Sequence, residues 1–301
     1  MDTPIVRIEN LSHRYSVQWA VRDINLEIRQ HGIYGLLGSN GAGKSTIMNI
    51  MCGVLKQTEG DIYIKGINTR IDPVEAKCHI GFLPQQPPLH PDLTVEEYLD
   101  YSARLRYIPH KEIPAAITEV VEKCGISHFR RRLIRNLSGG YQQRVGIAQA
   151  IIHNPDFIIL DEPTNGLDPN QIVEIRNLIK QIAQERTVIL STHILPEVQA
   201  TCEYIYMVEK GKMVDEFDNY ILPTTIRVTL LAHPTVEELT MIPGLVAAQH
   251  LGEMDYRLQF ADARNMVDEI IETCGIHNWR LSQIYMEKSS LDVVFAELSK
   301  K

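Results

Sequence analysis

The sequence predicts an α/β protein that carries a smaller α+β domain at its C-terminal end, and three observations support this expectation. A glycine-rich loop at residues 38–46 stands between an apolar, strand-like run and a helix-like run. A second apolar run, residues 157–161, ends in paired acids. From about residue 221 onward, short strand-like and helix-like segments alternate instead. We therefore expect one domain over residues 1–220 and a second over residues 221–301.

Bulk composition limits the class of protein. The chain has 301 residues, of which 44% are hydrophobic and 23% charged, as in ordinary globular proteins. The net charge is −8, whereas proteins that bind nucleic acid present a basic surface to the phosphates. We therefore expect no nucleic-acid partner. The five cysteines are scattered and form no C-x-x-C pair, which predicts a reducing compartment and no cysteine metal site. We also expect neither export nor a membrane-spanning helix, because no apolar run approaches about 18 residues.

The first stretch of the chain predicts strands. Residues Ile5–Glu9 and Ile24–Ile28 alternate apolar and polar side chains, the period of half-buried strands. They predict an antiparallel β layer ahead of the glycine-rich loop. We expect the stretch between them, Leu11–Val17, to form a turn, in which Tyr15 either stacks on a nucleotide base or packs within the fold.

The glycine-rich loop has the spacing G-x-x-x-x-G-K-[ST] in its required strand–loop–helix context. Glycines let backbone N–H groups wrap around phosphate oxygens, and the following helix presents the positive end of its dipole. Lys44 is placed to reach the β and γ phosphates, and the Ser45 hydroxyl to complete a Mg²⁺ shell. The predicted nucleotide-binding residues here are Gly38, Ser39, Asn40, Gly41, Ala42, Gly43, Lys44, Ser45 and Thr46.

A helical insertion follows. Four prolines between Pro84 and Pro91 exclude helix and strand from that segment. Helical periodicity begins near Asp92 and recurs over Lys111–Lys123, and we expect a helical subdomain at about residues 87–150. The basic run at residues 130–132, with Arg135, either faces solvent or contacts a phosphate or a partner.

Paired acids at Asp161 and Glu162 end the strand-like run 157–161. The carboxyl end of a buried parallel strand is where α/β sheets bind ligands. Asp161 is placed to hold Mg²⁺ and Glu162 to orient or deprotonate an attacking water, the alternative being a pair that caps a helix. His193 follows another buried strand and is either structural or a contact to the γ phosphate.

A further segment, Leu137–Arg144, opens a helix. Ser138 is placed as its N-cap, and the two glycines that follow let another group approach the helix start closely. Together with the loop and the acids, this segment makes the chain resemble the ATP-binding cassette (ABC) ATPases, the nucleotide-binding partners of ABC transporters. The resemblance covers roughly the first 215 residues, where residues 38–46 match Walker A, 137–142 the signature motif, 157–161 Walker B and 166–168 the D-loop.

The resemblance implies a P-loop NTPase cassette with a mixed sheet, an antiparallel β layer and a helical insertion, which binds ATP and Mg²⁺ and hydrolyses ATP. It implies that Glu162 is the catalytic glutamate, His193 the switch histidine and Gln85, or its neighbour Gln86, the glutamine that senses Mg²⁺ and the membrane partner. Tyr15 falls where the family has its adenine-stacking aromatic. Further ATP contacts are implied for Ser138, Gly139, Gly140, Gln142 and Asp168, and metal contacts for Ser45, Gln85 and Asp161.

Partners also follow from the resemblance. The chain has one copy of each motif, so the family mechanism requires a homodimer or a pair with a paralogous cassette. It also requires separate membrane-spanning permease subunits, which would hold this chain at the cytoplasmic face of the membrane. The tail Ser290–Phe295 resembles exporter-associated cassettes of the drug- or antibiotic-resistance type. The alternative is a soluble ABC ATPase that acts on ribosomes or DNA, although the chain length and the motif spacing fit neither type.

The C-terminal segments predict the order β-α-β-β-α-β, a ferredoxin-like arrangement. A last helix is expected to carry Leu291, Val294, Phe295 and Leu298 on one face. This domain is expected to regulate the cassette, to stabilise its dimer or simply to pack against it. The transported substrate is not encoded in this chain.

Overall fold

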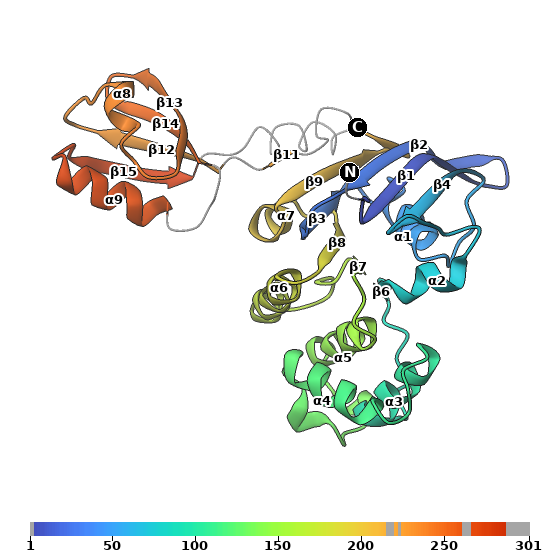
Figure 1. Ribbon diagram of the computed structural model, residues 1–301. Helices are drawn as coiled ribbons and strands as arrows, with labels where there is room; N and C mark the ends of the chain where they lie inside the picture. The colour runs from blue at the N-terminus through green and yellow to red at the C-terminus, as the bar shows by residue number, and fades with distance from the viewer. Residues whose placement is uncertain (1–2, 215–219, 222–223, 261–265, 287–301) are drawn as a thin grey trace. The chain divides into compact units, whose positions relative to one another are not determined.

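The computed structural model describes residues 3–214, 220–221, 224–260 and 266–286 (Figure 1). The chain divides into two compact units, Met1–Tyr220 and Ile221–Lys301. Each unit has its own hydrophobic core.

An antiparallel sheet of the first unit has the strand order β2-β1-β4-β5. Its strands are β1 (Val6–Tyr15), β2 (Gln18–Ile28), β4 (Glu59–Ile64) and β5 (Ile67–Asn68). The turn expected over Leu11–Val17 is wrong, because β1 continues to Tyr15 and only Ser16 and Val17 separate it from β2. Three register shifts in the pairing of β1 with β2 break the regular alternation from which strands are predicted.

A second, mixed sheet has the order β10-β9-β3-β8-β7-β6, and β11 pairs with β9. Neighbours from β9 to β6 are parallel, whereas β10 is antiparallel to β9. The strands are β3 (Gly32–Leu37), β6 (Ile80–Leu83), β7 (Phe157–Asp161), β8 (Thr187–Thr192), β9 (Tyr204–Glu209), β10 (Lys212–Met213) and β11 (Tyr220–Ile221). Most side chains of β3, β7 and β8 are buried, as parallel strands covered on both faces require.

Helix α1 (Lys44–Met51) packs against strands of both sheets, including β2 and β7. Its residues Ile47, Met48, Ile50 and Met51 are buried in one cluster with apolar residues of both sheets. The glycine-rich loop that precedes α1 is therefore attached to a helix that is packed into the core.

The remaining helices of the first unit are α2 (Pro73–Cys78), α3 (Val95–Leu105), α4 (Ile113–Lys123), α5 (Gly139–Ile151), α6 (Pro169–Ala183) and α7 (Leu195–Thr201), with two short 3₁₀ turns at Ser127–Phe129 and Ile134–Asn136. Helices α3, α4 and α5 contact one another and form the green group in Figure 1. Thr94 begins α3 with a capping box that it shares with Glu97. Helix α5 also contacts β6, which connects this group to the mixed sheet.

The basic run near residue 130 is partly neutralised. Arg130 forms an ion pair with Glu96, and Arg135 forms one with Asp92. These two arginines therefore connect the segment before α5 to the start of α3.

The second unit has the sheet order β13-β14-β12-β15 with antiparallel neighbours. Its elements are β12 (Thr224–Leu230), α8 (Val236–Leu239), β13 (Leu245–Gly252), β14 (Asp255–Phe260), α9 (Met266–Ile276) and β15 (Leu281–Met286). Val228, Leu258 and Ile270 lie in its buried core. The helix expected to carry Leu291–Leu298 lies outside the described residues.

Candidate active site

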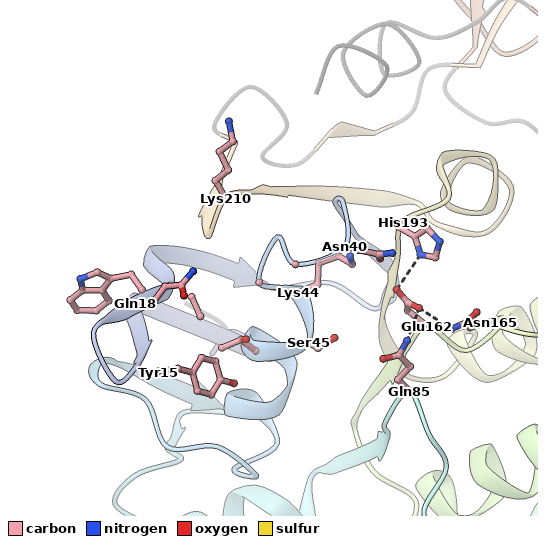
Figure 2. Close-up of a pocket in the computed structure, with 15 residues that line it drawn as sticks. Tyr15, Gln18, Asn40, Lys44, Ser45, Gln85, Glu162, Asn165, His193 and Lys210 are labelled. Carbon is pink, nitrogen blue, oxygen red and sulfur yellow. Dashed lines mark hydrogen bonds and ion pairs between the residues drawn. The ribbon is translucent and has the colours of Figure 1, made fainter. Parts of the chain in front are cut away.

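A cavity of about 880 Å³ opens where the glycine-rich loop, the β1–β2 hairpin and the carboxyl ends of β7 and β8 meet. Figure 2 shows Tyr15 and Gln18 on one side of it, Glu162, His193 and Gln85 on the other, and Lys44 and Ser45 between. The residues that line it are Tyr15, Gln18, Trp19, Ala20, Asn40, Gly41, Gly43, Lys44, Ser45, Thr46, Gln85, Glu162, Asn165, His193 and Lys210.

At two positions of the glycine-rich loop, only glycine fits. Gly43 has a φ of 109°, and a Cβ there would stand 2.6 Å from the Val21 side chain. A Cβ on Gly38 would stand 2.3 Å from the carbonyl oxygen of Val208. Side chains at these positions would push the loop off the sheets, so the glycines allow the loop its close approach to Val21 and Val208.

Lys44 is the first residue of α1 and is buried. Its Nζ donates to the carbonyl oxygens of Gly38, at 2.8 Å, and of Ser39, at 3.1 Å. Burial lowers the pKa of this ammonium, whereas the nearby carboxylates of Glu162 and Asp161 raise it. The loop thus holds the Lys44 ammonium against its own carbonyl groups, and triphosphate oxygens offer stronger, charged acceptors.

Three side chains bind the Glu162 carboxylate. Gln85 Nε2 donates to Oε2 at 3.0 Å, Asn165 Nδ2 donates to the same oxygen at 3.2 Å, and His193 Nδ1 lies 3.1 Å from Oε1 (Figure 2). Glu162 directly follows β7 with a φ of 48°, an uncommon conformation for a residue with a side chain. The three residues predicted as catalytic, Gln85, Glu162 and His193, therefore meet at one carboxylate.

Ser191 was missed by sequence reasoning. It lies fully buried on β8 and pairs in register with Asp161 of β7. Its hydroxyl donates to Asp161 Oδ1 and accepts from the backbone N–H of Glu162 at 3.0 Å. One hydroxyl thus orients both acids, and the only signal in the sequence was its place two residues before His193. Asn165 was also missed.

The side chains of Asp161, Ser45 and Gln85 offer donor atoms of the kind that Mg²⁺ binds. Asp161 offers a buried carboxylate, Ser45 a hydroxyl in the cavity, and Gln85 an amide oxygen, because its Nε2 is the atom bound to Glu162. In the described part of the chain, no group of three His, Cys, Asp or Glu residues could hold a metal alone. Mg²⁺ usually takes few protein ligands and completes its shell with water and phosphate oxygens, so this donor set is sufficient.

The signature residues do not line the cavity. Ser138 is the N-cap of α5 but makes no side-chain capping bond, and it is exposed. Gly139 is exposed as well, with no atom within 4 Å of where a Cβ would stand. Gly140 lies against the Gln171 side chain. The start of α5 therefore presents an open surface that is separate from the glycine-rich loop of the same chain.

Two other residues that were predicted to contact ATP form hydrogen bonds within the chain. Gln142 Nε2 donates to the carbonyl oxygens of Ile134 and Leu137, which fixes the turn before α5. The Asp168 carboxylate accepts from the backbone N–H groups of Asn170 and Gln171, which caps α6. Both residues therefore shape the surface on which Ser138 lies.

A phosphate loop before an enclosed helix, a buried lysine across it and a glutamate at the end of a parallel strand define a P-loop nucleoside-triphosphate hydrolase. The added antiparallel sheet and the helical group α3–α5 are those of an ATP-binding cassette. Comparisons with known proteins agree with this class: the family model described as "ABC transporter" matches residues 21–165.

Similar proteins fall in the same class. The bacitracin transport ATP-binding protein BcrA of Bacillus licheniformis is 39% identical over 214 residues, which are 70% of this chain and 69% of that protein. The linearmycin resistance ATP-binding protein LnrL of Bacillus subtilis is 28% identical over 98% of both chains.

Solved structures also match. One is cbiO1 from Clostridium perfringens, titled as part of the ABC transporter complex cbiONQ; it has a TM-score of 0.64 and 30% identity over 70% of this chain and 87% of that one. Another is the dimeric, post-hydrolysis state of the ATP-binding cassette MJ0796 bound to ADP and Pi, with a TM-score of 0.63 and 30% identity over 69% of this chain and 96% of that one.

The chain belongs to the ABC transporter family. It is the ATP-binding subunit of an ABC transporter and an ATPase, homologous to resistance-type cassettes, as the sequence predicted. The alternative of a ribosome- or DNA-acting ATPase is not favoured. Among the described residues, no helix has the length and apolar character needed to cross a membrane.

Replacement of Ser191 by alanine tests whether this hydroxyl positions the two acids. We expect Ser191→Ala to lower kcat and the apparent affinity for Mg²⁺ about tenfold each, because loss of a residue that orients a metal ligand has effects of that size. The measurement is the ATPase rate as a function of Mg²⁺ concentration. Thr187→Val is the matched control, since Thr187 is equally buried on β8 but bonds to His31. Equal Mg²⁺ dependence in both variants would contradict the assignment.

Proposed function

We propose that two copies of this chain pair so that each ATP lies between the glycine-rich loop of one copy and the start of α5 of the other. The observation that carries the proposal is the separation within one chain: Ser138 and Gly139 are exposed and lie outside the cavity that the loop lines. Free N–H groups at a helix start favour an anion, and a γ phosphate presented by a second copy supplies one. The dimeric structure of the MJ0796 cassette supports this arrangement.

The geometry of the site supports the following proposed roles. Lys44 exchanges its two carbonyl partners for the β and γ phosphates, and Tyr15, which is 53% exposed, stacks on the base. Glu162 orients the attacking water and accepts its proton, and His193 contacts the γ phosphate. Ser45, Asp161 and Gln85 would hold Mg²⁺, which neutralises phosphate charge when bound.

Hydrolysis couples to pairing through the γ phosphate. With ATP bound, the N–H donors of one copy and the loop of the other contact the same triphosphate, which stabilises the closed pair and excludes water. Attack of water on the γ phosphorus breaks its bond to the bridging oxygen, and ADP and phosphate are released. The contact that joined the two copies is then lost and the pair reopens.

Substitution of Glu162 by glutamine tests the pairing. We expect Glu162→Gln to bind ATP without hydrolysing it and to elute as a dimer in ATP but as a monomer without nucleotide, as measured by size-exclusion chromatography with light scattering. Glu119→Gln, an exposed change on α4, is the charge-matched control and should behave as the wild type. A wild-type ATPase rate in Glu162→Gln would remove Glu162 from its role, and a monomer in ATP would contradict the pairing.

A groove of about 370 Å³ on the first unit is the proposed docking site for a cytoplasmic segment of the separate permease subunit. It is lined by Val54 beyond α1, Cys78 of α2, Phe82 of β6, and Leu105 and Tyr107 at the end of α3. Val54, Leu105 and Tyr107 are each more than half exposed, so the chain carries apolar surface there that a partner can cover.

The groove lies beside the strand that leads to Gln85, so a permease segment bound there can affect the active site. Phe82 lies three residues before Gln85, and Gln85 donates to Glu162. A partner segment that moves against β6 can therefore shift the carboxylate that orients the water, and closure of the pair can move the partner. Because the similar proteins BcrA and LnrL are named for bacitracin transport and linearmycin resistance, we infer that this transporter exports its substrate and that this chain lies at the cytoplasmic face of the membrane through its permease.

A charge placed in the groove tests the docking site. We expect Val54→Glu to abolish co-purification of this chain with its permease from detergent-solubilised membranes, because an unpaired carboxylate would be buried. ATP binding by the isolated chain should remain unchanged. Val246→Glu is the matched control, since Val246 has the same 67% exposure as Val54 but lies on the second unit. Undiminished co-purification of Val54→Glu would exclude the groove.

A further inference from the structure

We propose that the tip of the β1–β2 hairpin reads the base of the bound nucleotide and that Gln18 is the residue that selects adenine over guanine. This inference rests on the proposed stacking of the base on Tyr15. Figure 2 shows Tyr15 and Gln18 on the side of the cavity away from Glu162, with Lys44 between the two sides. A nucleotide whose γ phosphate lies near Glu162 and whose β phosphate lies at Lys44 extends its base toward this hairpin.

Few groups at this end of the cavity can recognise the edge of a base. The hairpin contributes four lining residues, Tyr15, Gln18, Trp19 and Ala20. Ala20 has no polar side-chain group, the Tyr15 ring is assigned to stacking, and the Trp19 indole is only a donor. The Gln18 amide alone offers a donor and an acceptor side by side.

This pair of groups matches adenine. Adenine presents an acceptor at N7 next to a donor at N6, whereas guanine presents two acceptors, N7 and O6. We assign the N7 edge of the base to Gln18: there the amide can donate from Nε2 to N7 and accept at Oε1 from N6–H of adenine, whereas at the same edge of guanine it can satisfy only one position. Gln18 is paired with Tyr15 across the two-residue turn, so a base stacked on the ring has its edge next to the amide.

The hairpin tip is held in place by its neighbours. The buried His13 ring stands edge-on to the Tyr15 ring, with centroids 4.8 Å apart at 83°. The guanidinium groups of Arg14 and Arg22 lie over the Trp19 ring, at 5.6 and 4.9 Å from its centroid. Within the part of the chain that the structure describes, the Gln18 amide has no hydrogen-bond partner. These contacts hold the rings that flank Gln18, while the polar atoms of the exposed Gln18 amide stay available to a ligand.

The test is the ratio of the dissociation constants for ATP and GTP, measured by calorimetry on the full chain with Mg²⁺ in a Glu162→Gln background, so that nucleotide is not consumed. We expect ATP to bind about tenfold tighter than GTP, toward the lower part of the range for a bidentate contact between an amide and adenine. Gln18→Ala should remove this preference, because ATP loses two hydrogen bonds and GTP only one. Gln18→Arg should reverse it, because arginine donates to both N7 and O6 of guanine.

Val17→Arg is the matched control for charge. Val17 is 89% exposed at the same hairpin tip and does not line the cavity, so this variant should keep the wild-type ratio. Equal binding of ATP and GTP by the parent chain, or an unchanged ratio in Gln18→Ala, would overturn the assignment of Gln18. Tyr15→Ala separates the two proposals: if it weakens neither nucleotide, the stacking role itself fails, whereas a strong loss there with an unchanged Gln18→Ala ratio overturns the role of Gln18 alone.

Discussion

The packing of α1 between two sheets is the constraint on which the rest of the site depends. Met48 and Met51 are fully buried against strands of both sheets, so the helix cannot tilt to accommodate a different loop. Gly43 lies so close to Val21 of the antiparallel sheet that no side chain fits there. The loop backbone is therefore fixed by the packing around it, which lowers the reorganisation that binding of a phosphate requires. The antiparallel sheet therefore has two functions. It packs against the glycine-rich loop, and its β1–β2 hairpin forms the end of the cavity that we propose binds the nucleotide base.

The second half of the site is built from the ends of parallel strands. Glu162 follows β7, Ser191 belongs to the neighbouring β8, and Gln85 comes just after β6, on the other side of β7. Parallel pairing brings these three positions to one edge of the sheet, although they are far apart in the sequence. The Glu162 carboxylate is thereby connected through Gln85 to the groove beside β6, and this connection gives the proposed permease a physical route to the reacting water.

Local sequence patterns predicted most of the fold and of the candidate site. They could not predict contacts between segments that are distant in the sequence. The spacing from Gly38 to Ser45 and the acids at the end of the apolar run 157–161 specify chemistry within single segments. Ser191 could not be found, because its role depends on the register of β7 with β8. The extent of β1 was missed because register shifts disturb the alternation near His13. Gln142 and Asp168 were assigned to nucleotide contacts by motif, and only the structure shows that Gln142 bonds to the turn before α5 and that Asp168 caps α6.

The central claim is that a complete ATP site needs two copies of the chain, and mixing two defective variants tests it most directly. Lys44→Ala damages the loop and Ser138→Arg blocks the start of α5, so each variant alone should be inactive as an ATPase. Mixed in equal amounts, they should recover up to about a quarter of the wild-type rate, because half of randomly formed symmetric pairs contain both variants and each such pair has one intact site of two. No activity above that of the separate variants, or a wild-type rate in Ser138→Arg alone, would contradict the account.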